Sequence, residues 1–206
     1  SMKLDTLPIG LYGENIYVLH ENGHVLIIDP GKNAKEIAKC ISKDEIVDGI
    51  ILTHGHEDHT QATDDLVDIY SCEVYMDLAD YDLVDPRYAG SHGFDAPVYT
   101  PVKPLLKDMQ IGSFHVEVTK TPGHTKGSCV IRYRNLLFTG DTLFAGSIGR
   151  TDLYGGNETE MMQSLMKFMD MPHDLIVLPG HGPRSTIKQE LATNMYLQYV
   201  KKMVNV

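Results

Sequence analysis

A short segment of this chain carries four side chains that commonly bind divalent metal ions. His54, His56, Asp58 and His59 come directly after the apolar run Ile50–Leu52. Imidazole and carboxylate groups are the usual protein ligands of zinc and similar ions. His54 and His56 point the same way in an extended segment, because side chains there alternate with period two. Asp58 and His59 fall where the chain must turn into the next helix, so the cluster indicates a pocket for two metal ions.

Three further side chains of ligand type share one sequence context. His124, Asp141 and His181 each lie beside a glycine, shortly after an apolar, strand-like run. In α/β folds, functional groups collect on loops at strand ends. The 10 histidines of the chain could also scatter over surface loops by chance, but chance rarely repeats such a context. We therefore interpret these segments as parts of one metal site.

These motifs make the sequence similar to the metallo-β-lactamase superfamily, and within it to the small bacterial members of the glyoxalase II-like (hydroxyacylglutathione hydrolase-like) group. The matching segments follow the order of the family along nearly the whole chain: Leu26–Gly31, His54–His59, Gly123–Thr125, Gly140–Phe144 and Gly180–Gly182. The resemblance implies an α/β fold, an αβ/βα sandwich of two mixed sheets with helices on the outer faces. It also implies a single hydrolase domain over residues 1–206, without the C-terminal helical domain with which larger glyoxalase II enzymes hold glutathione.

The resemblance further implies a role for each ligand-type side chain. One metal ion would be held by three histidines: His54, His56 and His124. The second ion would be held by a mixed set: Asp58, His59 and His181. Asp141 would bridge the two ions. Enzymes of the family that open β-lactam rings usually carry cysteine at the bridging position, so Asp141 argues against that activity.

Three more residues are candidates for supporting roles. In the family, an aspartate at the position of Asp29 is a supporting residue, a role that fits metal-binding histidines in need of hydrogen-bond acceptors, although Asp29 before Pro30 could also be a plain turn residue. Arg150 follows the Asp141 motif, and its planar guanidinium could bind a substrate carboxylate. Alternatively, Arg150 pairs with Asp152 and only shapes the loop. Tyr154 is a further candidate for substrate contact.

Two divalent ions would supply the chemistry of such a site. Ions about 3.5–4 Å apart share a water molecule and lower its pKa toward ~7. The resulting metal-bridging hydroxide attacks a carbonyl carbon, and the oxyanion that forms is stabilised by a cation. Asp58 would orient the hydroxide as the catalytic carboxylate. Because the formal charge of the two ions exceeds that of Asp58, Asp141 and the hydroxide, the pocket would be positive and suited to an anionic substrate.

The expected function is hydrolysis of a thioester such as an S-(2-hydroxyacyl)glutathione. Zinc is the expected metal, and iron or manganese remain open because histidine and aspartate sites accept all three. The resemblance leaves other functions open: a persulfide dioxygenase with a single iron, a lactonase, a phosphodiesterase that cleaves RNA or DNA, and a metal-binding module without catalysis. The sequence does not identify the acyl group or the oligomeric state.

The composition limits which binding partners and which cellular compartment we expect for this protein. Hydrophobic residues make up 42% and charged residues 22% of the 206 positions, values typical of a globular chain. The formal net charge of -10 and the lack of a basic run argue against nucleic acid as a partner. We expect no membrane span, because no apolar run approaches ~18 residues, and no segment resembles a signal peptide. Cys40, Cys72 and Cys129 lack metal-type spacing and are typical of reduced thiols in a cytoplasmic protein.

Periodicity and turn signals predict alternating strands and helices, as in an α/β fold. The predicted strands are Asn15–Leu19, Val25–Asp29, Gly49–Thr53, Glu73–Met76, Val116–Thr119, Cys129–Tyr133, Leu136–Thr139 and Leu175–Leu178. The predicted helices are Asn33–Ser42, Gln61–Tyr70, Glu158–Met169 and Ile187–Lys202. Asn33 is expected to cap the first helix, and Thr186 with Gln189 to form a capping box for the last. The range Arg87–Pro101 is rich in glycine, proline and tyrosine and predicts a mobile loop near the site.

Overall fold

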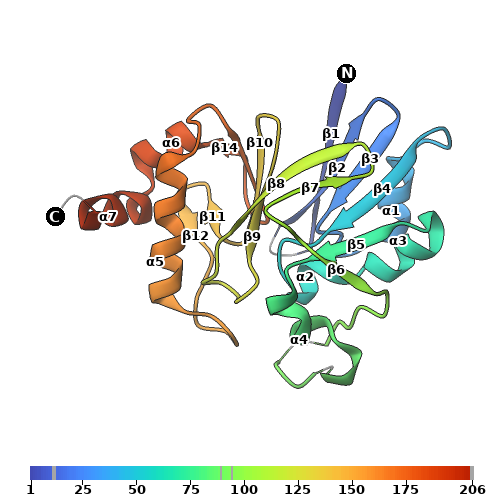
Figure 1. The fold of residues 1–206 in the computed structure, drawn as a ribbon, viewed down its shortest axis with the longest axis horizontal. Helices are drawn as coiled ribbons and strands as arrows, with labels where there is room; N and C mark the ends of the chain where they lie inside the picture. Colours follow the sequence, from blue (N-terminus) through green and yellow to red (C-terminus); the bar gives the residue numbers. More distant parts are fainter. Residues whose placement is uncertain (11–12, 89, 94, 205–206) are drawn as a thin grey trace.

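The protein is a sandwich of two β-sheets between two layers of helices. The computed structural model describes residues 1–10, 13–88, 90–93 and 95–204. Two six-stranded sheets pack face to face, and helices cover the outer face of each (Figure 1). The predicted αβ/βα sandwich is therefore confirmed.

The first sheet follows the order of the chain. Its strands are β1 (Met2–Ile9), β2 (Glu14–Glu21), β3 (His24–Ile28), β4 (Ile46–Ile51), β5 (Glu73–Met76) and β6 (Val102–Pro104). β1, β2 and β3 pair antiparallel, whereas β3 to β6 pair parallel. The carboxyl ends of β3, β4 and β5 consequently lie at one edge of this sheet.

The second sheet mixes sequence-neighbouring hairpins with one parallel pair. Its order is β14 (Ser185–Thr186), β13 (Ile176–Pro179), β10 (Leu136–Gly140), β9 (Cys129–Tyr133), β8 (Phe114–Lys120) and β7 (Asp108–Ile111). Only β10 and β13 pair parallel within this order, so their carboxyl ends also lie together. A small hairpin of β11 (Leu143–Phe144) and β12 (Ser147–Ile148) follows β10.

Hydrophobic side chains fill three layers between these elements. Strand β2 shows the pattern: Tyr17 and Leu19 pack between the sheets, while Ile16 and Val18 pack under the helices. Both faces of the strand are therefore buried, which explains why its middle residues, Ile16–Leu19, are apolar without a break. The inner layer of hydrophobic side chains packs between the two sheets and so fixes the position of one sheet relative to the other.

The helices cover the sandwich in two groups. On the first sheet lie α1 (Ala34–Lys39), α2 (Glu57–Thr60), α3 (Thr63–Tyr70) and α4 (Tyr81–Val84), with the 3-10 turns η1 (Leu78–Asp80) and η2 (Pro86–Tyr88) beside α4. On the second lie α5 (Glu158–Met166), η3 (Lys167–Asp170), α6 (Ile187–Thr193) and α7 (Met195–Val204). Among the described residues, no helix combines the length and the apolar character that crossing a bilayer requires.

Several predicted helix ends were wrong. The helix predicted over Ile187–Lys202 is divided at Asn194, whose buried Oδ1 accepts hydrogen bonds from the backbone N–H of Tyr196 and Leu197 and so starts α7. Thr186 caps α6 as predicted, because its hydroxyl accepts from the N–H of Gln189, but the Gln189 side chain donates to Thr193 rather than back across a capping box.

The structure also differs from the predicted elements in the N-terminal half of the chain. Asn33 has a left-handed backbone (φ 63°), and its side chain makes no capping hydrogen bond, so that predicted cap was wrong. The helix predicted from Gln61 begins at Thr63 and is preceded by the separate α2.

The sequence did not predict the six strands β1, β6, β7, β11, β12 and β14, which are sheet edges or two-residue strands without a continuous apolar run.

The loop predicted over Arg87–Pro101 falls partly outside the described residues, at positions 89 and 94. In the described part, the backbone N–H groups of Tyr99 and Thr100 donate to the carboxylate of Asp64 in α3. Its mobility stays a prediction. The three thiols are free, with Cys129 buried and Cys40 and Cys72 half-buried.

Candidate metal centre

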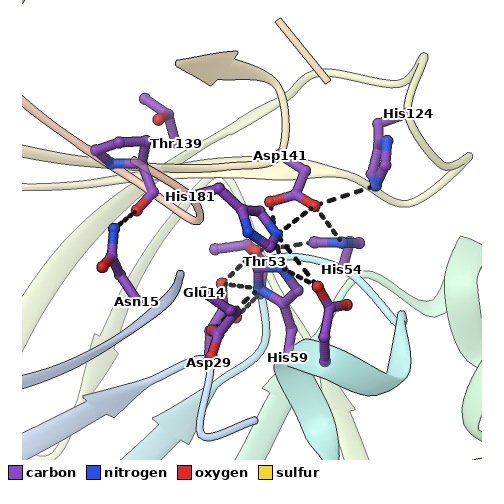
Figure 2. Close-up of polar contacts among 12 residues, drawn as sticks. Glu14, Asn15, Asp29, Thr53, His54, His59, His124, Thr139, Asp141 and His181 are labelled. Carbon is purple, nitrogen blue, oxygen red and sulfur yellow. Dashed lines mark hydrogen bonds and ion pairs between the residues drawn. The ribbon is translucent and has the colours of Figure 1, made fainter. Parts of the chain in front are cut away.

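The seven side chains of ligand type meet where the carboxyl ends of strands from both sheets face each other. His54 and His56 follow β4, and Asp58 and His59 lie in α2. The second sheet supplies the remaining three from the turn after β8 and from the ends of β10 and β13: His124, Asp141 and His181. Figure 2 shows His54, His59, His124 and His181 directed toward the carboxylate of Asp141. The structure thus brings together residues that lie up to 127 positions apart, from 54 to 181.

The ligand atoms form two groups, each compact enough for one ion. One group contains three histidines, and its nitrogen atoms all lie within 4.8 Å of one another: His54, His56 and His124. The other group contains two carboxylates and two histidines within the same limit of 4.8 Å: Asp58, His59, Asp141 and His181. These are the same groups that the family resemblance implied.

The carboxylate of Asp141 lies between the two groups. Its Oδ2 is 3.3 Å from Nε2 of His124 and 3.3 Å from Nε2 of His181. Its Oδ1 is 3.1 Å from Nε2 of His59. One carboxylate therefore reaches histidines of both groups, as a bridging ligand would.

Several buried nitrogen atoms in this cluster have no hydrogen-bond partner among the described residues. These atoms are the Nε2 nitrogens of His54, His59 and His124. A buried polar atom left unpaired costs stability, so native proteins rarely keep several together without a ligand. The converging nitrogens fit divalent cations, which would use these lone pairs. The side chains present could therefore hold metal.

Partners on Nδ1 leave the Nε2 nitrogens facing the cluster. Nδ1 of His59 lies 2.9 Å from Oδ2 of Asp29, and Nδ1 of His124 lies 2.7 Å from the backbone oxygen of Arg150. Because a carboxylate or carbonyl oxygen only accepts, the proton of each neutral ring belongs on Nδ1. The Nε2 lone pair of each ring then points at Asp141.

Thr53 connects a third histidine to the same support. Its backbone N–H and its hydroxyl both donate to the Asp29 carboxylate, at 2.7 Å each. The Thr53 oxygen then accepts from Nδ1 of His54 at 3.1 Å. Asp29 was expected to support metal-binding histidines, and it contacts His59 directly and His54 through Thr53. Thr53 was missed, and its position directly before His54 is the only sequence signal that pointed to it.

Two glycines let the backbone approach these ligands. A Cβ atom at Gly180 would lie 2.3 Å from Oδ1 of Asp141 and 2.6 Å from Cε1 of His59. A Cβ atom at Gly149 would lie 1.7 Å from the backbone oxygen of Asp141. A larger residue at either position would displace ligand side chains or their backbone.

The two groups differ in electrostatics. Burial lowers the pKa of His56 to about 3 and lowers that of His54 well below its usual value, so both rings are neutral. In the other group, burial also acts against the charged imidazole, but hydrogen bonds to Asp141 and Asp58 raise the pKa of His181 to about 10. The carboxylates of Asp141, Asp29 and Asp58 likewise raise the pKa of His59. Without metal, this second group therefore holds protons.

Glu14 is a buried carboxyl group that the sequence did not single out. It is 3% exposed, its Oε1 is 3.7 Å from Nδ1 of His59, and burial raises its pKa to about 9. A cavity of about 180 Å³ opens next to it, and Asp58 and His181 also line this cavity. Nothing in the polar start of β2 marked Glu14 as part of the site.

The candidate substrate residues both have partners on the protein. The guanidinium of Arg150 is exposed and bonds to both carboxylate oxygens of Asp152, at 2.6 and 2.9 Å. The Tyr154 hydroxyl donates to Asp82 at 2.6 Å. The Tyr154 ring stacks on the His92 ring, with 3.9 Å between the ring centroids. The ion pair with Asp152 is the alternative that the sequence left open, and a substrate role for Arg150 or Tyr154 stays a prediction.

Comparison with known proteins identifies a family. A model of the metallo-beta-lactamase superfamily matches residues 9–181. The probable metallo-hydrolase YqgX of Bacillus subtilis is 34% identical over 207 residues, covering 95% of this chain and 98% of the relative. The hydroxyacylglutathione hydrolase GloC of Haemophilus influenzae is 28% identical over 208 residues, covering 95% of this chain and 98% of the relative.

Solved structures agree with this match. The B3 metallo-beta-lactamase BLEG-1 is 34% identical and superposes with a TM-score of 0.87, covering 95% of this chain and 99% of that one. TTHA1623, crystallised in a di-iron-bound form, is 31% identical with a TM-score of 0.79, covering 92% of this chain and 98% of that one.

Substitution of Gly180 tests whether close packing holds the ligands in place. We expect Gly180→Ala to lower the affinity for divalent metal by at least about tenfold, because the added methyl group would push on Asp141 and His59. Metal content after dialysis, measured by mass spectrometry, gives the result. Circular dichroism and thermal unfolding of Gly180→Ala serve as the control, because a kept fold shows that lost metal does not result from unfolding. Unchanged metal content in Gly180→Ala would contradict this packing argument.

Proton release tests the electrostatics of the second group. A raised pKa means that His181 keeps its proton in the metal-free protein up to pH of about 10, so a metal ion must displace that proton at neutral pH. Metal affinity should therefore rise with pH up to that value. We expect calorimetric titrations at pH 7.5 in buffers of different ionisation enthalpy to show proton release, with about one proton fewer for His181→Ala. Heats that do not depend on the buffer would contradict the expected protonation.

Proposed function

Because this chain belongs to the metallo-beta-lactamase superfamily and is a metallo-hydrolase of that family, we propose that it hydrolyses a thioester such as an S-(2-hydroxyacyl)glutathione. The observation that carries the proposal is the position of Asp141 between two groups of ligand atoms. Such an arrangement suits two metal ions that act on one carbonyl group.

We assign the two ions as the groups suggest. His54, His56 and His124 hold the first, Asp58, His59 and His181 hold the second, and Asp141 is shared. The set contains no cysteine, so it accepts zinc, iron or manganese. Zinc remains our proposal, and the di-iron form of TTHA1623 supports iron as the other strong candidate.

The bound ions supply a water of lowered pKa and stabilise negative charge on the carbonyl oxygen of the substrate. We propose that Asp58 orients that water through a hydrogen bond. The Asp58 side chain is 45% exposed, whereas the Asp141 side chain is 8% exposed, so Asp58 faces the opening of the site. Although burial acts in the opposite direction, His59 and a hydrogen bond from His181 lower the pKa of Asp58. Asp58 is consequently ionised at neutral pH and accepts a hydrogen bond from the attacking water.

The choice of a thioester rests on the relative GloC and on charge. GloC is named a hydroxyacylglutathione hydrolase, and it aligns with 95% of this chain. A thiolate leaves readily, and an anionic glutathione moiety would suit a pocket with a surplus of positive charge. The backbone oxygen of Arg150 bonds to His124, which places this residue beside the site. We propose that its side chain releases Asp152 and binds a substrate carboxylate.

A second candidate is hydrolysis of a β-lactam amide. BLEG-1 is named a B3 metallo-beta-lactamase and is 34% identical to this chain. This likeness weighs against the argument that Asp141 in place of cysteine disfavours β-lactams. Persulfide oxidation with one iron and lactone hydrolysis remain alternatives, and both belong in the same substrate panel.

Hydrolysis of S-lactoylglutathione is the direct test. We expect the metal-loaded protein to turn over this thioester with a kcat/KM of about 10⁴ M⁻¹s⁻¹ or more, the lower range for enzymes on their own substrates. Asp141→Asn should lose metal from both groups and at least about 99% of the activity, because it removes the shared negative charge. Loss of thioester absorbance measures the rate.

A chromogenic cephalosporin, a lactone and a persulfide, each assayed with the same protein, decide between the candidates. Turnover of the cephalosporin without turnover of the thioester would replace the proposal with β-lactam hydrolysis. Oxygen uptake with persulfide and a single bound iron would replace it with persulfide oxidation. Full activity of Asp141→Asn would contradict the ligand assignment itself.

The role of Arg150 can be separated from a structural one. If Arg150 binds an anionic group equally in the ground state and the transition state, Arg150→Ala raises KM about five- to fiftyfold and leaves kcat nearly unchanged. A neutral thioester should show no such increase. Arg134→Ala is the control, since Arg134 forms an exposed ion pair with Glu21 at the end of β10 away from Asp141. An unchanged KM for the anionic substrate would leave Arg150 as a partner of Asp152 only.

A further inference from the structure

A buried carboxylate joins the two loops that carry the three-histidine group. Asp80, the last residue of η1, is 1% exposed. Its Oδ1 accepts a hydrogen bond from the N–H of Gly127 at 2.6 Å. Its Oδ2 accepts from the N–H of Gly55 at 3.0 Å and from the hydroxyl of Thr125 at 2.6 Å. Both oxygens are therefore used, and all the donors come from outside the segment of Asp80.

The donors of these hydrogen bonds lie next to candidate ligands. Gly55 lies between His54 and His56, and Thr125 follows His124. The loop with Gly55 leaves β4 of the first sheet, whereas the loop with Thr125 and Gly127 connects β8 and β9 of the second. The carboxylate of Asp80 thus connects the two sheets at the point where they supply the three histidines.

The backbone around this carboxylate has no spare room. A Cβ atom at Gly127 would lie 2.7 Å from Cγ of Asp80, and one at Gly55 would lie 3.0 Å from Cβ of Leu83 in α4. The Thr125 oxygen is also 2.6 Å from the Ser128 hydroxyl, which accepts from the N–H of Thr125 at 3.1 Å. Close packing and hydrogen bonds together fix the distance between the two loops.

A carboxylate is suited to this place for a chemical reason. It accepts only, and it can accept from several donors at once. An amide of the same shape would turn an NH₂ group toward one or more of the three donors and could not satisfy them all. Hydrogen bonds to an ionised acceptor are also shorter and stronger than those between neutral groups.

We propose that Asp80 is a positioning residue that sets the spacing of His54, His56 and His124 and thereby the metal affinity of that group. The inference rests on the proposed assignment of a metal ion to these histidines. The second group has its own support, because Asp29 bonds directly to His59. Loss of the Asp80 carboxylate therefore weakens one metal position and spares the other.

The test measures metal binding at each position separately. In a His181→Ala background the three-histidine group is the principal site, and in a His124→Ala background the other group is. We expect Asp80→Asn to weaken zinc binding about 10- to 100-fold in the first background and less than about threefold in the second. Competition with a chromophoric chelator gives the affinities, and the visible spectrum of bound Co²⁺ reports ligand geometry without any assay of activity.

Asp64→Asn is the matched control. Asp64 in α3 likewise accepts from two backbone N–H groups and one threonine hydroxyl, but its donors belong to Tyr99 and Thr100 rather than to the histidine loops. It should leave both affinities unchanged. Circular dichroism and thermal unfolding of each variant check that the fold is kept.

Thr125 provides a second pair of variants should Asp80→Asn fail to fold. Thr125→Val removes one donor to Asp80 and should weaken the three-histidine group, whereas Thr125→Ser keeps the hydroxyl and should restore binding. Equal weakening of both groups, or none in folded variants, would overturn the role of Asp80. A wild-type protein that binds two ions but cleaves no thioester would refute the proposed substrate and leave this inference standing. A protein that binds no metal would refute both.

Discussion

The carboxylate of Asp141 is the constraint on which the site depends. It is buried among the imidazoles of both groups, at 3.1 to 3.7 Å from four of them. Three of these rings, His54, His59 and His124, already use Nδ1 for partners outside the cluster, so their Nε2 atoms converge on the same carboxylate. Cations at the centre would stabilise this arrangement, and protons can partly replace them. The raised pKa of His59 and His181 and the lowered pKa of Asp141 describe this second, metal-free state.

Two aspartates behind the ligands hold the site in shape. Asp29 directly follows β3 of the first sheet, where it accepts from Thr53 and faces His59. Asp80 ends η1 and accepts from both histidine loops. Gly149 and Gly180 add close contacts with Asp141. Ligand geometry is thus fixed by side chains and backbone that do not themselves offer an atom to a metal, which is the usual way proteins prepare a metal site.

The sequence predicted the ligand groups better than their supports. His54 and His56 could be paired because strand alternation is local, and His124, Asp141 and His181 could be found because each follows an apolar run beside a glycine. Asp80 could not be found in this way, since its partners are backbone N–H groups on loops that are distant in sequence. Asn194 illustrates the same limit for the fold: its side chain divides a predicted helix by capping α7 and by donating to the backbone of Ser147. The edge strands were missed because half of their surface faces solvent, so they lack the continuous apolar run that marks the central strands.

The ligands come from both sheets, and this has a consequence for assembly. The first sheet supplies His54, His56, Asp58 and His59, whereas the second supplies His124, Asp141 and His181. Neither half of the chain contains all members of the three-histidine group or of the group with Asp58, so high-affinity binding to these groups would arise only after the sheets have docked. A bound ion would then act as a non-covalent cross-link between the sheets and would stabilise the native state over partly folded ones. Metal supply would in this way govern how long the protein survives proteolysis as well as whether it is active.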